Sequence, residues 1–337
     1  MSYKQMTGNI ISATKVEPDG STFADSAASG VWSLQDQYDY KRGGNWPITG
    51  FLPIGLFGSI DTANNGSEVG IERININSTG NSIDTADLTV SRDGLGSCGS
   101  STRAIWMGGG SSNVIDFTTF ASLGDATDFG DLGNTAAGCV AACNSTRAVI
   151  IRLDDIYYIT MASEGNSSSF GNHPGADKSY CTACGNDTRI LFFGGSNDEQ
   201  DITYVTIATT GNGANFGDCQ HSYSHQANGM ICSNTRGIAA GGYSSNSGGK
   251  TNVIVYSTIA SLGNATDFGD LTGQKYDMGA CSSTIRGVMS GGADNNKSNV
   301  IEYITIATTG NGTDFGDLTI AEATGIAGCS AVHGGLQ

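Results

Sequence analysis

Nine cysteines are the residues of this chain that first suggest chemistry, because cysteine thiolates bind metal ions. Cys181 and Cys184 form a Cys-x-x-Cys pair, and Cys139 lies close to Cys143. Six cysteines, however, recur once in each copy of an internal repeat: Cys98, Cys143, Cys184, Cys232, Cys281 and Cys329. Thiols at one equivalent position of successive repeats lie too far apart to share one ion. We therefore predict small buried side chains and no metal site.

An arginine follows five of these cysteines, at Arg103, Arg147, Arg189, Arg236 and Arg286. A sialidase-like site would need arginines that converge on one carboxylate, together with a tyrosine nucleophile. Arginines that occur once in each repeat are spread apart instead. We expect each one to pair with a backbone carbonyl or with an aspartate of a nearby Phe-Gly-Asp turn. The sequence therefore indicates no catalytic residue.

Aspartates and histidines leave two weaker metal hypotheses open. Asp267 and Asp270 of an Ala-Thr-Asp-Phe-Gly-Asp segment could contribute to a calcium site, although a role in capping a turn is favoured. His173, His221 and His225 fall in loops of successive repeats and could share one face, but polar loop residues are the simpler interpretation. We expect no cofactor.

The repeat itself predicts the elements that position these residues. Segments related to ATTGNGTDFGDLT occur six times, with their leading glycines 41 to 52 residues apart at Gly80, Gly124, Gly165, Gly211, Gly263 and Gly310. They alternate with segments such as CGNDTRILFFGG and with β-prone segments such as NVIEYITIA. Each repeat therefore holds four short strands, named a (ending near the cysteine), b (Thr-Arg to Gly-Gly), c (Asn-Val-Ile) and d (Asp-Phe-Gly-Asp).

Four antiparallel strands in about 45 residues match one blade of a β-propeller. The last repeat stops after its strand a, in residues 325–337, whereas the first begins with a strand b in residues 53–60. We therefore predict an all-β, six-bladed propeller over residues 51–337. Its ring closes when the C-terminal strand a joins the N-terminal strands b, c and d.

Composition and charge exclude other classes of protein. The 337 residues include 50 Gly but only 4 Pro, without a three-residue period, which excludes collagen. The net charge is −16 and basic runs are absent, so we expect neither nucleic acid nor anionic lipid as a partner. No signal peptide or membrane span is expected, and the thiols suit assembly in a reducing cytoplasm.

Residues 1–50 differ from the repeats and form a predicted N-terminal extension. It contains Trp32 and Trp46, and a short helix is expected over 34–42, which includes Leu34 and Tyr38. These four side chains are candidates for anchoring the propeller to another protein. The alternative, that the extension packs on one face of the propeller, is equally open.

The glycine doublet after strand b and the aromatic strand c resemble kelch repeats, with Phe in place of the usual Trp of strand d. Repeats such as NVIEYITIATTGNGTDFGDLT followed by CSSTIRGVMSGG also resemble propeller proteins of marine bacteriophages, which are described as tail fibre or structural proteins. The segment ASGVWSLQDQYDYKRGGNWP is similar to the head segment of such proteins. This resemblance implies a component of the virion, assembled in the host cytoplasm and present in many copies or as a homo-oligomer.

The connections from b to c and from d to a vary in length and content, and in a propeller they emerge on one side, which we call the loop face. Divergent loops on a rigid scaffold are typical of a binding surface. Our candidate binding residues there are Tyr180, His221, Tyr223, His225, Tyr243 and Tyr276. The sequence thus favours a phage tail fibre or tail-associated adhesin that binds a host glycan or protein and attaches to other virion proteins through residues 1–50. The alternatives are a decoration protein of tail or capsid without a receptor and a polysaccharide-acting enzyme.

Overall fold

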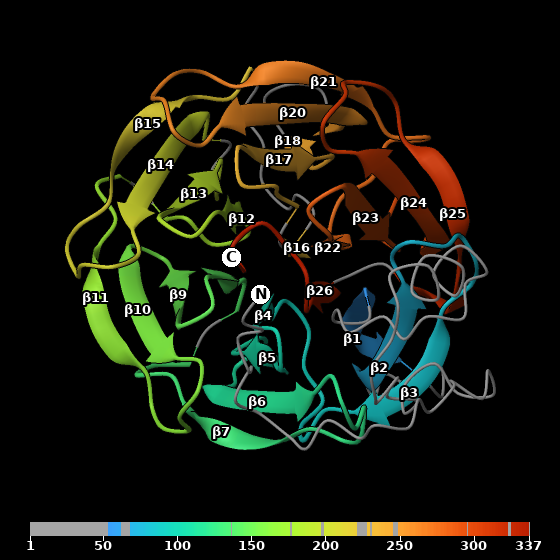
Figure 1. Cartoon of the computed structure of the whole chain (residues 1–337), viewed down its shortest axis with the longest axis horizontal. Helices are drawn as coiled ribbons and strands as arrows, with labels where there is room; N and C mark the ends of the chain where they lie inside the picture. Colours follow the sequence, from blue (N-terminus) through green and yellow to red (C-terminus); the bar gives the residue numbers. More distant parts are fainter. Residues whose placement is uncertain are drawn as a thin grey trace, which may run out of the picture. The chain divides into compact units, whose positions relative to one another are not determined.

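The computed structural model describes residues 53–61, 68–135, 137–175, 177–196, 199–220, 228–229, 231–244, 249–294, 296–322 and 325–336. These residues form strands and turns arranged as six blades around a central axis (Figure 1). The prediction of a six-bladed, all-β propeller is confirmed. The predicted extension, with its helix over 34–42 and its candidate anchors Trp32, Leu34, Tyr38 and Trp46, lies outside the described residues.

The strands of blades 1 to 3 follow one another outward from the axis. Blade 1 contains β26 (Ala327–Ser330), β1 (Ile54–Asp61), β2 (Glu68–Asn75) and β3 (Ile83–Asp87). Blade 2 contains β4 (Gly96–Gly99), β5 (Arg103–Met107), β6 (Val114–Thr119) and β7 (Thr127–Asp131). Blade 3 contains β8 (Val140–Cys143), β9 (Arg147–Arg152), β10 (Asp155–Thr160) and β11 (Ser168–Asn172).

Blades 4 and 6 have the same four strands, whereas blade 5 is modified at its inner edge. Blade 4 contains β12 (Thr182–Gly185), β13 (Arg189–Phe193), β14 (Asp201–Thr206) and β15 (Ala214–Asp218). Blade 5 contains β17 (Arg236–Ala240), β20 (Val253–Thr258) and β21 (Thr266–Asp270). Blade 6 contains β22 (Gly279–Ser282), β23 (Arg286–Ser290), β24 (Ser298–Thr305) and β25 (Thr313–Glu322). In blade 5 the inner position is occupied by a single bridge between Cys232 and Gly237. The short strand β16 (Asn228–Gly229) pairs in parallel with β22 and β26 instead.

The ring closes as expected. Strand β26 pairs with β1 in antiparallel register, with Leu56 opposite Cys329 and Gly55 opposite Ser330. The chain then continues across one end of the axis, where a side chain on Gly334 would overlap Ser233 and one on Gly335 would overlap the carbonyl of Cys143. In this C-terminal segment, His333 Nε2 lies 2.6 Å from the carbonyl oxygen of Gly99 at the end of β4.

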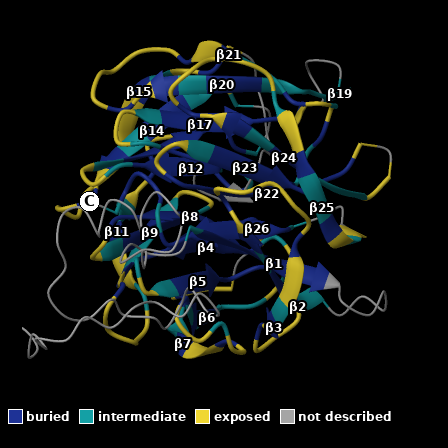
Figure 2. Ribbon diagram, turned by 45° about the vertical axis from the view of Figure 1, so that its right-hand side comes forward, coloured by how far each residue is buried: buried dark blue, intermediate teal, exposed yellow. Residues whose placement is uncertain are grey.

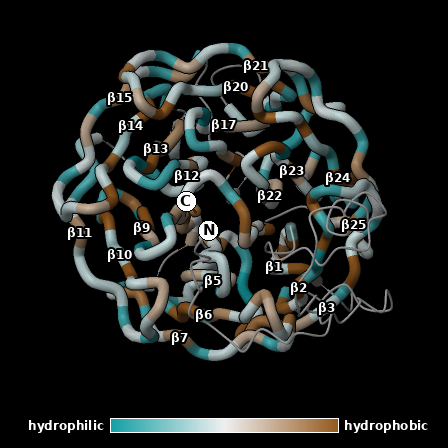
Figure 3. The backbone as a smooth tube through the Cα atoms, in the orientation of Figure 1, coloured by the Kyte–Doolittle hydropathy of each residue, from teal (hydrophilic) through white to brown (hydrophobic). Residues whose placement is uncertain are grey.

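Burial increases toward the axis, because each blade packs on two neighbours. All residues of β4, β8, β12, β22 and β26 are buried, whereas strand d exposes its first residues (Figure 2). Hydrophobic stretches recur around the ring between hydrophilic turns (Figure 3). The core is therefore built between blades and is continuous through the ring.

Pairs of glycines explain the fixed glycine positions of the repeat. A Cβ atom on the glycine of five Phe-Gly-Asp or related segments would come within 2.5 Å of the backbone of a glycine in the following blade: Gly130 on Gly165, Gly171 on Gly211, Gly217 on Gly263, Gly269 on Gly310 and Gly316 on Gly80. No larger residue fits such a close backbone approach. The blade 1 segment carries Ala86 at this position, so its junction with blade 2 differs from the other five.

The repeated arginines join neighbouring blades through carbonyls, one of the two partners expected. Each guanidinium lies 4.3 to 5.0 Å from the centre of a strand c aromatic ring of its own blade: Phe117, Tyr158, Tyr204, Tyr256 and Tyr303. Each one also donates through Nη1 to a carbonyl in the next blade, such as Arg286 to Ile76 at 2.9 Å. The aromatic ring in turn packs edge-on against the Phe of strand d, as Tyr303 does against Phe315.

The prediction that six cysteines share one position needs correction. Cys98 lies opposite Ile105, two residues after Arg103, whereas Cys143 lies opposite Ala148, one residue after Arg147. Three residues separate Cys143 and Cys232 from the following arginine, whereas four residues do so after the other cysteines that precede an arginine. Cys143 and Cys232 therefore lie one position further along strand a, and their side chains point to the opposite face of the blade. Cys143 accordingly lies 3.1 Å from the carbonyl of Gly99 in the preceding blade. All nine cysteines are buried free thiols, as expected of small core residues.

Candidate binding face

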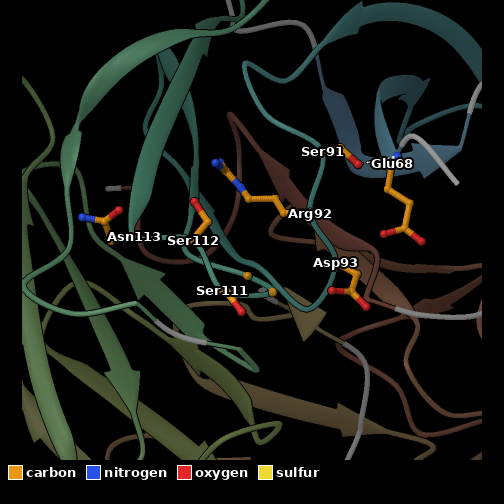
Figure 4. Close-up of a pocket in the computed structure, with 9 residues that line it drawn as sticks. Glu68, Ser91, Arg92, Asp93, Ser111, Ser112 and Asn113 are labelled. Carbon is orange, nitrogen blue, oxygen red and sulfur yellow. Dashed lines mark hydrogen bonds between the residues drawn. The ribbon is translucent and has the colours of Figure 1, made fainter.

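A hollow of about 600 Å³ opens on the loop face between blades 1 and 2 (Figure 4). It is lined by Glu68, Ser91, Arg92, Asp93 and residues 109–113. The connection from blade 1 to blade 2 forms one wall and the β5–β6 connection the other. Two hydrogen bonds hold these walls, from Glu68 N to Ser91 Oγ (3.0 Å) and from Gly110 N to the carbonyl of Asp93 (2.8 Å).

Arg92 is the buried charged residue among those that line the hollow. Its side chain is 1% exposed, and Nη2 lies 2.8 Å from Oδ2 of Asp116. Nε and Nη1 are buried and have no hydrogen-bond partner among the described residues. Burial lowers the pKa of the Arg92 guanidinium, against the opposing effect of Asp116.

Asp116 belongs to a set of buried carboxylates at one position of strand c, Glu72, Asp116 and Glu302. Each accepts hydrogen bonds from the threonine that ends an Asp-Leu-Thr segment in the preceding blade: Thr319, Thr89 and Thr272. Lys275 pairs with Glu302 at 2.9 Å, as Arg92 does with Asp116. Where the threonine is absent, at Gly133, Pro174 and Gln220, strand c carries Tyr157, Thr203 and Val255. The Arg92–Asp116 pair is therefore part of how blades join.

A third buried cation, Lys178, lies between blades 3 and 4. Its Nζ contacts Asp201 Oδ1 at 2.5 Å, Glu199 Oε2 at 3.0 Å and the carbonyl of Gly194 at 2.8 Å. His173 lies in the same region, with Nε2 2.5 Å from Thr203 Oγ1. Burial and the charge of Lys178 lower the pKa of His173 to about 4, so this histidine is neutral at pH 7.

Tyr180 lies two residues before β12, the inner strand of blade 4. Its φ of +60° is uncommon for a bulky residue, and its ring covers Gly138, where a Cβ would come 2.8 Å from the ring. Burial raises the pKa of the Tyr180 hydroxyl, and nearby Asp277 and Asp93 raise it further. Asp277 lies in the connection from blade 5 to blade 6, and Asp93 lies in the connection from blade 1 to blade 2.

Tyr243 and Tyr276 are the two predicted candidates that the structure brings together. Their ring centres lie 5.9 Å apart with an angle of 56° between the rings. The ring of Tyr180 packs over Gly138, and His221, Tyr223 and His225 lie outside the described residues. Arg92, Asp93 and the Gly-Ser segment around Ser111 were not among the residues predicted from the sequence. The sequence signal that could have identified Arg92 is a basic residue three positions after the threonine of Asp-Leu-Thr, which recurs at Lys275.

No group of three or more His, Cys, Asp or Glu side chains in the part of the chain that the structure describes is placed to hold a metal ion. Nor does any helix within this part have the length and apolar character needed to cross a membrane.

Fold and loops together define the class of this protein, a six-bladed β-propeller in which one face carries divergent loops and an open polar hollow. Comparison with protein-family models finds no match, and comparison with curated protein sequences finds none either.

Proposed function

We propose that this chain is a structural protein of a bacteriophage particle, a tail fibre or tail-associated adhesin whose loop face binds the surface of the host cell. Residues 1–50 attach it to other virion proteins. The protein has no catalytic role. Many copies on one particle would compensate for weak binding at each single site.

The observation that carries the binding role is the hollow between blades 1 and 2, because it opens on the face where the loops diverge. The scaffold beneath it is fixed by buried ion pairs and close glycine contacts. A rigid scaffold that presents variable loops is suited to recognition. The assignment to a phage particle is supported by the resemblance of the repeats to marine phage structural proteins.

Two measurements test the proposal. Antibody labelling of purified particles should place the propeller on the tail, and a chain without residues 1–50 should fail to assemble there. Its absence from particles would overturn the virion assignment. Labelling on the capsid, or assembly without residues 1–50, would overturn the tail location or the anchor.

Binding is tested with the purified full chain and cells of the host bacterium. Filling the hollow with Ser111→Trp should weaken cell binding at least about tenfold, a difference of about 1.4 kcal/mol. Ala121→Trp, on an exposed c-to-d turn of blade 2, should have no effect and is the matched control. Absence of binding by the unmodified chain would favour a decoration protein, and depolymerisation of a surface polysaccharide would favour an enzyme.

A further inference from the structure

Three loops of blades 5 and 6 converge around Tyr243 and Tyr276. Tyr243 begins the small hairpin of β18 (Tyr243–Ser244) and β19 (Gly249–Lys250), which extends the b-to-c loop of blade 5. Tyr276 lies in the connection from blade 5 to blade 6. Backbone hydrogen bonds tie the loops together, from Gly242 N to the carbonyl of Lys275 (2.8 Å) and between Tyr276 and Ala293 in both directions (3.2 and 3.0 Å). The position of both rings is therefore set by a hydrogen-bonded framework.

This aromatic pair lies outside the repeat. The strand c tyrosines, such as Tyr256, are covered by an arginine on one side and meet the edge of a phenylalanine. Tyr243 and Tyr276 come instead from loops outside the repeat, and Tyr243 is 38% exposed. An exposed, rigid tyrosine offers an apolar ring face and a polar hydroxyl to a ligand at a small entropic cost.

Hydrogen-bonding groups border the rings. Lys250 Nζ lies 5.9 Å from the centre of the Tyr276 ring and 3.2 Å from Oδ1 of Asp294. The Asp294 side chain is 61% exposed, so its carboxylate can also accept hydrogen bonds from a ligand. The charged groups of Lys250 and Asp294 beside the rings make a purely apolar ligand a poor match.

We propose that Tyr243, Tyr276, Lys250 and Asp294 form a subsite for a neutral glycan. The apolar C–H face of a sugar ring stacks on Tyr243, and its hydroxyls bond to Lys250 and Asp294. The net charge of −16 and the adjacent carboxylates disfavour acidic polysaccharides. This inference rests on the proposed binding role of the loop face and names its ligand class.

The test uses the full chain and an immobilised panel of neutral hexose, N-acetylhexosamine, hexuronate and sialylated oligosaccharides. The unmodified chain should bind neutral members. Tyr243→Ala should weaken that binding at least about tenfold, Tyr243→Phe should keep most of it, and Asp294→Asn should weaken it about two- to fivefold. Leu262→Ala, on the exposed c-to-d turn of blade 5 away from the loop face, should leave it unchanged. Thermal unfolding checks that every variant is folded.

Each other outcome is decisive. If Tyr243→Ala is folded and binds neutral oligosaccharides as the unmodified chain does, the subsite is wrong although the face still binds. Exclusive binding of acidic members overturns the ligand class. If the chain binds host cells but no oligosaccharide, the glycan assignment fails while the proposed function stands. If it binds neither, both fail.

Discussion

Thr319 of blade 6 donates its hydroxyl hydrogen to the carboxylate of Glu72 in blade 1, across 247 residues of sequence. Ser82 donates to the same carboxylate, and all of this lies where the first and last blades meet. Glu72 is fully buried. One side chain thus satisfies polar groups from two blades at the point of ring closure.

Replacing Glu72 by alanine should therefore destabilise the protein, because the buried Ser82 hydroxyl and the part-buried contact of Thr319 lose their acceptor. We expect the free energy of unfolding to fall by about 2–4 kcal/mol in urea titrations. Glu164→Ala removes a carboxylate whose side chain is 54% exposed and should cost less than about 0.5 kcal/mol. Equal effects of the two substitutions would contradict a special role for Glu72.

Gly316→Ala tests the close contact between glycines of neighbouring blades. The added Cβ would meet the backbone of Gly80 at 2.5 Å, and the φ of Gly316 is +151°. We expect a loss of about 2–4 kcal/mol in the free energy of unfolding. A Cβ added on Gly124 would have no atom within 4 Å, so Gly124→Ala is the control and should change stability little.

His173 predicts a specific dependence of stability on pH. Its pKa is about 4 in the folded chain and near 6.5 when unperturbed. Between these values the unfolded state binds a proton that the folded state does not bind. The free energy of unfolding should therefore fall as pH falls from about 6.5 to 4, by about 1–3 kcal/mol from this residue.

The matched comparison is His173→Gln, in which carboxylates still titrate but the imidazole is gone. Unfolding titrations at several pH values should show a shallower decline for this variant over the same window. Parallel profiles for the two proteins would contradict the assignment.

The thiols give a prediction about reactivity. Burial raises the pKa of Cys139, Cys181 and Cys219 to about 12, so the reactive thiolate is scarce at pH 7. A thiol reagent should label almost none of the nine cysteines in the folded protein and all nine in urea. Rapid labelling of the native chain, read by mass spectrometry, would show that one or more thiols are accessible.

The architecture could be predicted because the sequence repeats, and each blade packs on its neighbours through residues of the same types at equivalent positions. The last repeat stops after its strand a and the first begins with a strand b in residues 53–60, which was enough to predict that the final strand completes the first blade. The same reasoning failed for Cys143, because one residue fewer before Arg147 reverses the direction of a strand side chain. Alternation along a strand makes such single-residue shifts decisive.

The binding face was predictable only as a set of loops. Tyr243 and Tyr276 could be named from the divergence of their segments, but the distance between their rings depends on hydrogen bonds among three loops. The hollow was not predicted, since Glu68, Asp93 and Ser111 come from three separate segments. Its buried cation could have been inferred from the joint occurrence of Thr89, Arg92 and Asp116, which Thr272, Lys275 and Glu302 repeat.

The pairing of Leu56 with Cys329 also determines when the ring can exist during synthesis. Blade 1 lacks its inner strand until β26 has left the ribosome. Until then the ring of blades stays open, and the inner edge of β1 is unpaired. Such edges bind other chains readily. A chain that ends before Ala327 should therefore aggregate or be degraded, even though almost all of its blades are complete.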